Sequence, residues 1–225
     1  GLPYFAIFLL AGLLPWNLYG VALGAATTSI TGNASLVTKV WFPREILPLA
    51  AIGAGLVHFT LQTIVLFAAL LVFRYQPAWS YLPLIPLALF TLVLVLAALS
   101  IGLAAINVYA RDTQHLLELA LLAWFWMTPI VYTYRQVADR IGSLFLINPL
   151  TPIVITFQRV IYNRTQVVSR PKGGGAPTVT HVLPASADWL WYVRNLGIVM
   201  VVSVVLLLGA LAIFGRLEDN FAEEI

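Results

Sequence analysis

Residues 87–99 read LALFTLVLVLAAL, and this stretch decides the class of fold. It lies inside a charge-free run from residue 75 to residue 110, bounded by Arg74 and Arg111. That run exceeds the roughly 20 residues that an α-helix needs to cross a bilayer. The apolar residues do not alternate with polar ones, as they would along the roughly ten-residue strands of a membrane β-barrel. The stretch therefore predicts a membrane-spanning helix.

The composition of the whole chain agrees with this prediction. Of its 225 residues, 61% are hydrophobic and 9% are charged, and the mean hydropathy is +0.93. A typical soluble domain is about 45–50% apolar and about 25% charged, so we expect an integral membrane protein. This excludes a disordered chain, a coiled coil and a nucleic-acid-binding domain. The lack of cysteine excludes disulfides, thiol catalysis and Cys-ligated metals.

The gaps between charges predict a single all-α transmembrane domain over residues 1–225. Its five full spans are expected at about 4–28, 48–73, 82–108, 115–133 and 189–214. Residues 141–161 differ, because Asn148-Pro149 and Thr151-Pro152 place two prolines three apart, a spacing that breaks a helix. We expect a re-entrant helical hairpin there, which dips into the membrane and returns to the same side. The Gly- and Pro-rich stretch 165–187 is expected to be an external loop.

The connection between the first two spans, residues 33–45, is amphipathic and mixed in charge. Asn33 or Ser35 is suited to cap a short helix that ends before Pro43. Such a helix can rest on the lipid headgroups. It can also serve as a docking element for a soluble partner, and the residues alone leave both interpretations open.

Polar and small residues inside the predicted spans are a second set of candidates. His58 and Gln62 lie one helical turn apart in the second span. Polar side chains at membrane depth are functional candidates, although an interhelical hydrogen bond explains this pair more simply than a proton relay. Gly20 and Gly24 form a G-x-x-x-G motif in the first span, which allows close helix contact within the chain or between subunits.

Aromatic residues also gather near the membrane centre. They are Trp16, Tyr19, Trp124, Phe125, Trp126 and Tyr132. Such rings either pack helices together or stack against sugars.

Arg111 and Asp112 close the third span, and His115 and Glu118 follow them. Positions 111, 115 and 118 share one helix face. These residues form an interfacial charge cluster or, with less support, a catalytic site. The sequence contains no Walker motif, so this chain does not bind ATP through one.

Five motifs in order carry a resemblance to a known family. They are LAGLLPWN at 10–17, NASLVTKVWFPREILP at 33–48, NVYARD at 107–112, TPIVY at 128–132 and NPL at 148–150. Their order and spacing resemble the type-2 ABC exporter permeases of polysaccharide export. This Wzm/TagG-type group exports O-antigen, teichoic acid and mycobacterial galactan. Each motif alone is weak, but five in order across nearly the whole chain are specific.

The resemblance implies a homodimer of permeases in the plasma (inner) membrane. Two separate ATPase subunits would bind ATP and Mg, so this chain is expected to bind no cofactor or metal and to be no enzyme by itself. The implied cargo is a polysaccharide linked to a polyprenyl pyrophosphate. Membrane lipid is a further expected partner, and no nucleic-acid partner is expected. The family has six spans preceded by an amphipathic helix. The expected spans match numbers two to six, so this chain is expected to lack the amphipathic helix and the first span.

The resemblance also assigns roles to individual residues. The coupling segment that docks on the ATPase would contain Thr38, Lys39, Phe42, Pro43, Arg44 and Glu45. The six aromatic residues named above would face the sugar channel. The gate would contain Asn148, Pro149, Thr151 and Pro152, and Arg111 and Asp112 would form a cytoplasmic turn. Whether Arg135, Arg140 or Arg159 contacts the pyrophosphate is left open.

Orientation is a point of conflict between the resemblance and the charges. The resemblance places 29–47 and the C-terminus in the cytoplasm and 134–187 outside. This leaves four basic residues inside and eight outside, against the positive-inside rule. Six of those eight lie in one long segment, where the rule is weaker, so we follow the resemblance. The alternatives from other classes are a membrane-embedded enzyme acting on polyprenyl phosphates and an ATPase-independent channel.

Overall fold

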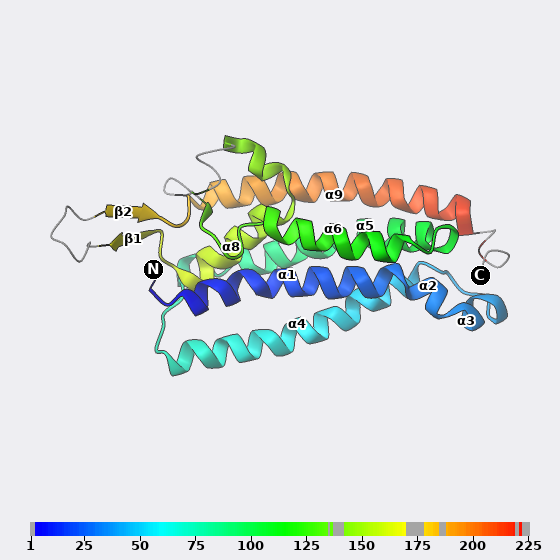
Figure 1. Cartoon of the computed structure of the whole chain (residues 1–225), viewed down its shortest axis with the longest axis horizontal. Coiled ribbons are helices and arrows are strands. Elements are labelled where there is room, and N and C mark those ends of the chain that lie inside the picture. The colour runs from blue at the N-terminus through cyan, green and yellow to red at the C-terminus, as the bar shows by residue number, and fades with distance from the viewer. Residues whose placement is uncertain are drawn as a thin grey trace.

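The protein is a bundle of long helices (Figure 1). The computed structural model describes residues 3–134, 136, 142–169, 178–184, 188–218 and 221. Among these residues, four helices are long and apolar enough to cross a membrane: α1 (Phe5–Thr27), α4 (Ile46–Val72), α5 (Leu84–Tyr109) and α9 (Trp189–Leu217). The expected all-α membrane fold is therefore confirmed, and the protein is a multi-pass membrane protein.

Shorter elements connect and complete the bundle. They are α2 (Ser29–Gly32), α3 (Ala34–Lys39), the 3₁₀ helix η1 (Trp79–Tyr81), α6 (Thr113–Met127), the 3₁₀ helix η2 (Gly142–Ile147), α8 (Leu150–Tyr162), and the strands β1 (Gln166–Ser169) and β2 (Thr178–His181). The two strands pair antiparallel, with Gln166 opposite His181. This hairpin lies in the stretch 165–187, which the sequence predicted to be a loop without strands. Residues 170–177 and 185–187 lie outside the described part of that stretch.

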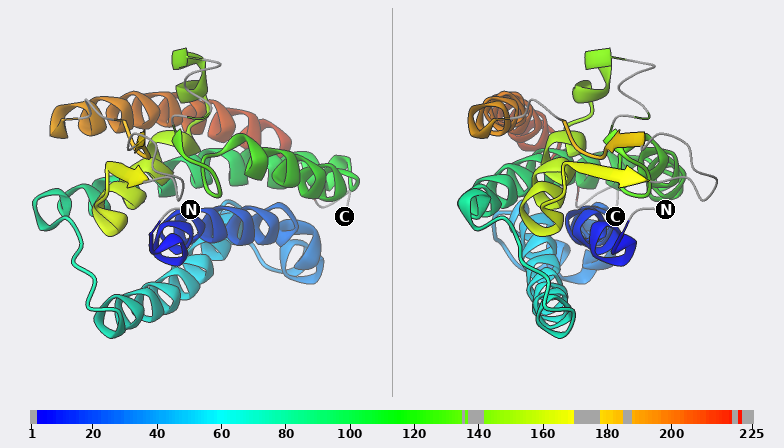
Figure 2. Two further views of the ribbon diagram at one scale, coloured as in Figure 1. Left: turned by 60° about the vertical axis from the view of Figure 1, so that its left-hand side comes forward. Right: turned by 90° about the vertical axis from the view of Figure 1, so that its left-hand side faces the viewer.

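The helices run up and down between two ends of the bundle. The N-terminal end holds residues 3–4, the connection 73–83 and the β1–β2 hairpin (Figure 1). The C-terminal end holds α2, α3, the turn 110–112 and the end of α9. Viewed along the long axis, α4 and α9 lie at opposite edges of the bundle, with α8 between them (Figure 2).

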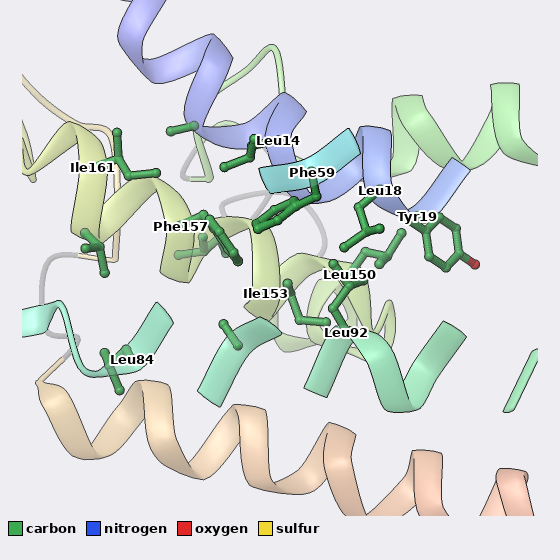
Figure 3. Close-up of a cluster of buried hydrophobic side chains, with 14 of the residues drawn as sticks. Leu14, Leu18, Tyr19, Phe59, Leu84, Leu92, Leu150, Ile153, Phe157 and Ile161 are labelled. Atoms are coloured by element: carbon green, nitrogen blue, oxygen red, sulfur yellow. The ribbon is translucent and has the colours of Figure 1, made fainter. Parts of the chain in front are cut away.

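The main core forms around α8, which lies inside the bundle. Every residue of this helix except Arg159 is buried, and its side chains meet those of α1, α4 and α5 (Figure 3). Glycine allows the close approach of α1, because a Cβ at Gly12 would lie 2.9 Å from Nε2 of Gln158. A Cβ at Gly55 would likewise lie 3.0 Å from Cβ of Ala22, so the contact between α4 and α1 also depends on glycine.

A second, smaller core lies at the C-terminal end. It consists of Ile30, Val37, Ile101, Ala104, Ala105, Val108, Phe214 and Phe221. These residues come from α2, α3, α5, α9 and the chain after α9. The coupling segment is therefore packed onto the ends of two long helices.

The structure corrects two expectations, one about the length of a helix and one about a helix break at proline. The predicted span 115–133 is the 15-residue helix α6, which is about 22 Å long and shorter than a full span. It ends at Met127, and Thr128 is extended (φ −108°, ψ 137°) because a residue before proline is disfavoured in the helical region. In the gate segment, Pro152 does not break the helix. It lies in the first turn of α8, where proline is tolerated.

Candidate functional site

Three polar side chains lie at membrane depth on one face of α1 and α4: half-buried Asn17 and exposed His58 and Gln62. Asn17 Nδ2 donates a hydrogen bond to Gln62 Oε1 at 3.3 Å, and both residues line a pocket of about 200 Å³ together with His58. The imidazole of His58 is exposed and makes no hydrogen bond to any of the described residues. It lies about 18 Å along α4 from Ile46, close to the middle of a bilayer core of about 30 Å. The expected interhelical hydrogen bond exists for Gln62, whereas His58 lacks one.

The face of α1 beside this pocket is also unpacked. Val21 is 56% exposed, and no atom lies within 4 Å of a Cβ built at Gly20 or Gly24. The G-x-x-x-G motif therefore does not pack against any other part of the chain that the structure describes. Helical spacing places these glycines between Asn17, which faces α4, and Trp16, which faces α6.

The aromatic cluster joins α1 to α6. The ring centroid of Trp16 lies 5.4 Å from that of Phe125, and the Tyr19 ring lies 5.5 Å from Trp124. Tyr19 has no exposed surface, so its predicted role in facing a sugar is wrong, and it packs the two helices together instead. Trp126, in contrast, is 61% exposed.

The remaining surface of α6 is open. Only Leu117 is buried in this helix, while Leu116, Leu119, Leu122 and Met127 are exposed. Tyr132 lies near the end of α6, and its hydroxyl donates to the backbone oxygen of Trp126 at 2.8 Å. The polar pocket on α1 and α4, the small residues of α1 and the exposed side of α6 thus form one continuous face, which we call the open face.

Asn148 fixes the tip of the predicted gate against α6. Its Oδ1 accepts hydrogen bonds from Nε1 of Trp124 at 2.8 Å and from the backbone nitrogen of Leu150 at 3.0 Å. Its Nδ2 donates to Oγ1 of Thr128 at 3.0 Å and to the backbone oxygen of Met127 at 3.3 Å. Because Trp124 is about 16 Å along α6 from Thr113, this tip lies well away from the end of the bundle at which α6 begins.

The rest of the gate is held by buried contacts. Thr151 is fully buried, and Pro149 and Pro152 line a pocket of about 530 Å³ between α5, α6 and α9. Gln158, which sequence reasoning missed as a site residue, donates from Nε2 to the backbone oxygen of Pro129 at 2.9 Å. This bond ties the middle of α8 to the loop after α6.

The three arginines considered as pyrophosphate contacts are only partly described. Arg159 lies with its Cζ 4.3 Å from the ring centroid of Tyr81 and donates from Nη1 to Asn163 Oδ1 at 3.3 Å. Arg135 and Arg140 lie outside the described residues.

The coupling segment forms a short helix and a groove at the C-terminal end. Helix α3 ends at Lys39, and residues 37–45 with Glu218 line a groove of about 560 Å³. Trp41 is 97% exposed beside it. Lys39 and Thr38 are exposed, Phe42 and Glu45 are half-buried, and Pro43 is exposed. A solvent-facing groove of mixed charge can accept a protein surface.

Arg44 contacts its own chain rather than solvent alone. Its Nη1 donates to the backbone oxygen of Glu218, and its Cζ lies 5.9 Å from the ring centroid of Phe221. The hydroxyl of Tyr109 donates to the backbone oxygen of Leu217 at 2.9 Å. The last residue of α9 and the residue after it therefore join the end of α5 to the coupling segment. The link from Arg44 spans 174 positions, and no local sequence signal indicates it.

Arg111 and Asp112 lie in the exposed turn between α5 and α6 at the same end of the bundle. His115 and Glu118 are exposed on α6. Among the described residues, no group of three or more histidine, cysteine or acidic residues is arranged to hold a metal ion.

Comparisons with known proteins give similarity along the whole chain. It is 30% identical over 226 residues to the "O-antigen export system permease protein RfbA" of Myxococcus xanthus, which covers all of this chain and 77% of the relative. Two relatives of the same name from Klebsiella pneumoniae are each 26% identical, over 162 and 164 residues. These matches cover 72% and 73% of this chain, and 62% and 63% of the relatives. No family model matches the chain.

Proposed function

Because the chain belongs to the family of O-antigen export permeases, we propose that it is the transmembrane subunit of an ABC exporter for polysaccharide. The finer proposal is that ATP drives export and that the polysaccharide is linked to a polyprenyl pyrophosphate. In this proposal the protein lies in the plasma membrane with its C-terminal end in the cytoplasm. The chain itself is not an enzyme, and ATP and Mg belong to the partner subunits.

The open face is the single observation that carries this proposal. Exposed His58 and Gln62 would be costly against lipid, because an uncompensated polar group in an apolar medium costs roughly 2–7 kcal/mol. Such side chains are stable at this depth when they line a water-filled cavity or meet another protein surface. A hydrated path bounded by amide groups and by the exposed ring of Trp126 suits a sugar chain.

A second copy of the chain is the proposed partner for this face. The glycines of α1 leave room for a close helix contact at its centre. Two copies that face each other would enclose the polar groups between them and cover the exposed leucines of α6. The resulting homodimer would leave the lipid-facing side of α9 outside.

The groove at the C-terminal end is the proposed docking site for the ATPase. Its helix α3 and the link from Arg44 to the end of α9 form one packed unit with the end of α5. Displacement of the coupling segment would therefore move α5 and α9 as rigid elements. The gate at Asn148, held against α6, is the proposed element that such motion opens.

Cysteine crosslinking tests the enclosed face directly, because the chain has no native cysteine. Val21→Cys lies on the open face, and Val205→Cys is the matched control, since it is 64% exposed on α9. We expect Val21→Cys to form a disulfide-linked dimer in membranes and Val205→Cys to stay monomeric. Crosslinking of Val205 alone would place the second copy on the other side and remove the proposed path.

Function is tested by export and by the partner ATPase. We expect Gln62→Leu to lower the surface polysaccharide of a permease-deficient strain, while the dimer still forms. We also expect an ATPase to co-purify with the chain and its hydrolysis rate to depend on the chain. Normal export by Gln62→Leu, or hydrolysis unaffected by the permease, would contradict the proposal.

A further inference from the structure

A pocket at the N-terminal end is separate from every site described so far. It has a volume of about 300 Å³ and is lined by Tyr4, Phe73, Arg74, Tyr75, Gln76, Asn163 and Arg164. These residues come from the start of α1, the connection after α4 and the connection after α8. The pocket thus lies where three helices reach one end of the bundle, at the depth expected for lipid headgroups.

The backbone around this pocket is unusual. Tyr4, Arg74 and Asn163 have φ values of 55°, 49° and 53°, and they are the non-glycine residues with positive φ in the described part of the chain. All three line the same pocket. Left-handed residues are common after helices such as α4 and α8, but glycine serves that purpose with less strain than arginine. Strained positions tend to gather at functional sites. The end of α4 alone would be served better by glycine, so the arginine at position 74 indicates a function for its side chain.

The charge of the pocket favours an anion. The described residues at this end include Arg74, Arg159, Arg164 and Arg194 but only one carboxylate, Asp188. Neither Arg74 nor Arg164 forms an ion pair with a carboxylate among the residues described. The ends of α4 and α8 contribute about half a negative charge each, and the start of α1 about half a positive charge. Two guanidinium groups outweigh that sum.

The guanidinium of Arg164 is positioned by aromatic rings. Its Cζ lies 5.2 Å from the ring centroid of Tyr4 and 5.9 Å from that of Tyr75. The guanidinium also hydrogen-bonds to the Tyr75 side chain, and of its five N–H donors the others remain for contacts with an anion. Oδ1 of Asn163 already accepts from Arg159, so the Nδ2 group of Asn163 remains as a donor. The pocket therefore offers donors in the planar, charged form that matches phosphate oxygens.

The same pocket is connected to the end of α8. The Tyr75 hydroxyl donates to the backbone oxygen of Tyr162, and the Tyr162 hydroxyl donates to the backbone oxygen of Pro3 at 2.9 Å. Burial raises the pKa of Tyr75, and Arg164 lowers it in part, so the hydroxyl stays protonated as a donor. The backbone nitrogen of Ala78 also donates to the oxygen of Val160 at 2.8 Å. A bound group would thus contact the loop that fixes the end of α8.

We propose that this pocket binds the phosphate ester of a membrane lipid headgroup through Arg74 and Arg164. The source can be a glycerophospholipid of the bilayer or the pyrophosphate of a polyprenyl lipid. The proposal does not rest on export, because binding is measured directly on the purified chain.

The test compares two probes that carry phosphate with one that does not. Native mass spectrometry of the full chain in detergent would measure its affinity for phosphatidylglycerol, for a polyprenyl pyrophosphate and for dioleoylglycerol. We expect Arg164→Gln and Arg74→Gly each to weaken binding of the phosphate lipids by roughly tenfold, the scale of a lost charge-assisted hydrogen bond. Arg194→Gln is the matched control, since Arg194 is exposed at the same end outside the pocket, and its affinity should stay within about twofold.

The variant at position 74 separates ligand binding from a purely structural role. Glycine adopts positive φ readily, so Arg74→Gly should unfold at a temperature no lower than that of the unaltered chain while it loses affinity. Equal affinities for the two phosphate lipids would identify the site as a general headgroup site, and a tenfold preference for the pyrophosphate would identify a carrier-lipid site. If Arg74→Gly and every folded Arg164 variant bind both phosphate lipids as tightly as the unaltered chain, the proposal is wrong.

Discussion

Replacement of Asn148 by alanine should loosen the tip of the gate from α6. The side chain makes four hydrogen bonds, to Trp124, Leu150, Thr128 and Met127. Side-chain hydrogen bonds within membranes average about 0.6 kcal/mol, so four bonds give about 2.4 kcal/mol. Alanine also leaves the indole N–H of Trp124 without its acceptor, which adds to the loss. We therefore expect Asn148→Ala to lower the free energy of unfolding by about 2–3 kcal/mol.

A double-mutant cycle isolates the bond between Asn148 and Trp124. Trp124→Phe removes the indole N–H while keeping a ring that packs on Tyr19. The free energy of unfolding of both single variants and the double variant can be measured by steric trapping in lipid nanodiscs. We expect a coupling energy of about 1 kcal/mol. Thr27→Val is the matched control, because its hydroxyl donates to the backbone oxygen of Leu23 and Thr27 does not line the pocket that Trp124 lines, so it should not couple to Trp124→Phe.

A coupling energy below about 0.3 kcal/mol would refute this account of the gate, because residues without direct interaction are additive within that range. The gate would then be held by the buried face of α8 alone. Hydrogen exchange in the first turn of α8 gives an independent readout, since loss of Asn148 should raise exchange there and leave the second half of the helix protected.

Substitutions in the coupling segment, the aromatic cluster and the contact of α1 with α8 should have different effects. Lys39→Glu should reduce recovery of the ATPase in a pull-down without unfolding the permease, and unchanged recovery with a folded variant would remove the docking assignment. Arg44→Glu should also lower the unfolding temperature, because Arg44 binds the chain after α9. Trp126→Ala should reduce surface glycan more than it reduces assembly, because the Trp126 ring is exposed. Tyr19→Ala should lower the free energy of unfolding by about 3–5 kcal/mol in thermal unfolding, because Tyr19 is a buried aromatic residue. A loss of stability for Trp126→Ala and a loss of export alone for Tyr19→Ala would contradict these roles. Gly12→Ala should destabilise the chain by about 1–3 kcal/mol because its Cβ meets Gln158, and an unchanged unfolding temperature would argue against close contact of α1 and α8.

The long spans could be predicted from sequence because lipid imposes a simple rule. A charge-free run must satisfy its backbone within a helix, and α1, α4, α5 and α9 begin and end within a few residues of the expected bounds. The rule failed for 115–133, because it counts apolar residues and ignores Pro129. The extended backbone of Thr128 shows that this proline was the stronger signal.

The remaining elements depend on contacts that sequence periodicity does not contain. The apolar helix α8 was expected to be interrupted, yet its second proline falls in the tolerated first turn. Strands β1 and β2 are rich in valine and threonine, a signal that the Gly- and Pro-rich stretch between them obscured. The coupling segment was predicted from its mixed charge and from the resemblance, and its docking role stays a prediction. The link from Arg44 to the chain after α9 and the bond from Gln158 to Pro129 arise only in the folded bundle.

The short, exposed helix α6 has a consequence for how the protein is made. At about 22 Å it does not reach across the hydrocarbon layer, and it carries Gln114, His115 and Glu118 near its start. Such a segment is a poor substrate for insertion on its own, since polar residues oppose partition from the translocon into lipid. Its contacts with α1 and α5 are made by helices that leave the ribosome earlier. We therefore expect α6 to enter the membrane by packing against α1 and α5, which are already synthesised, rather than as an independent span.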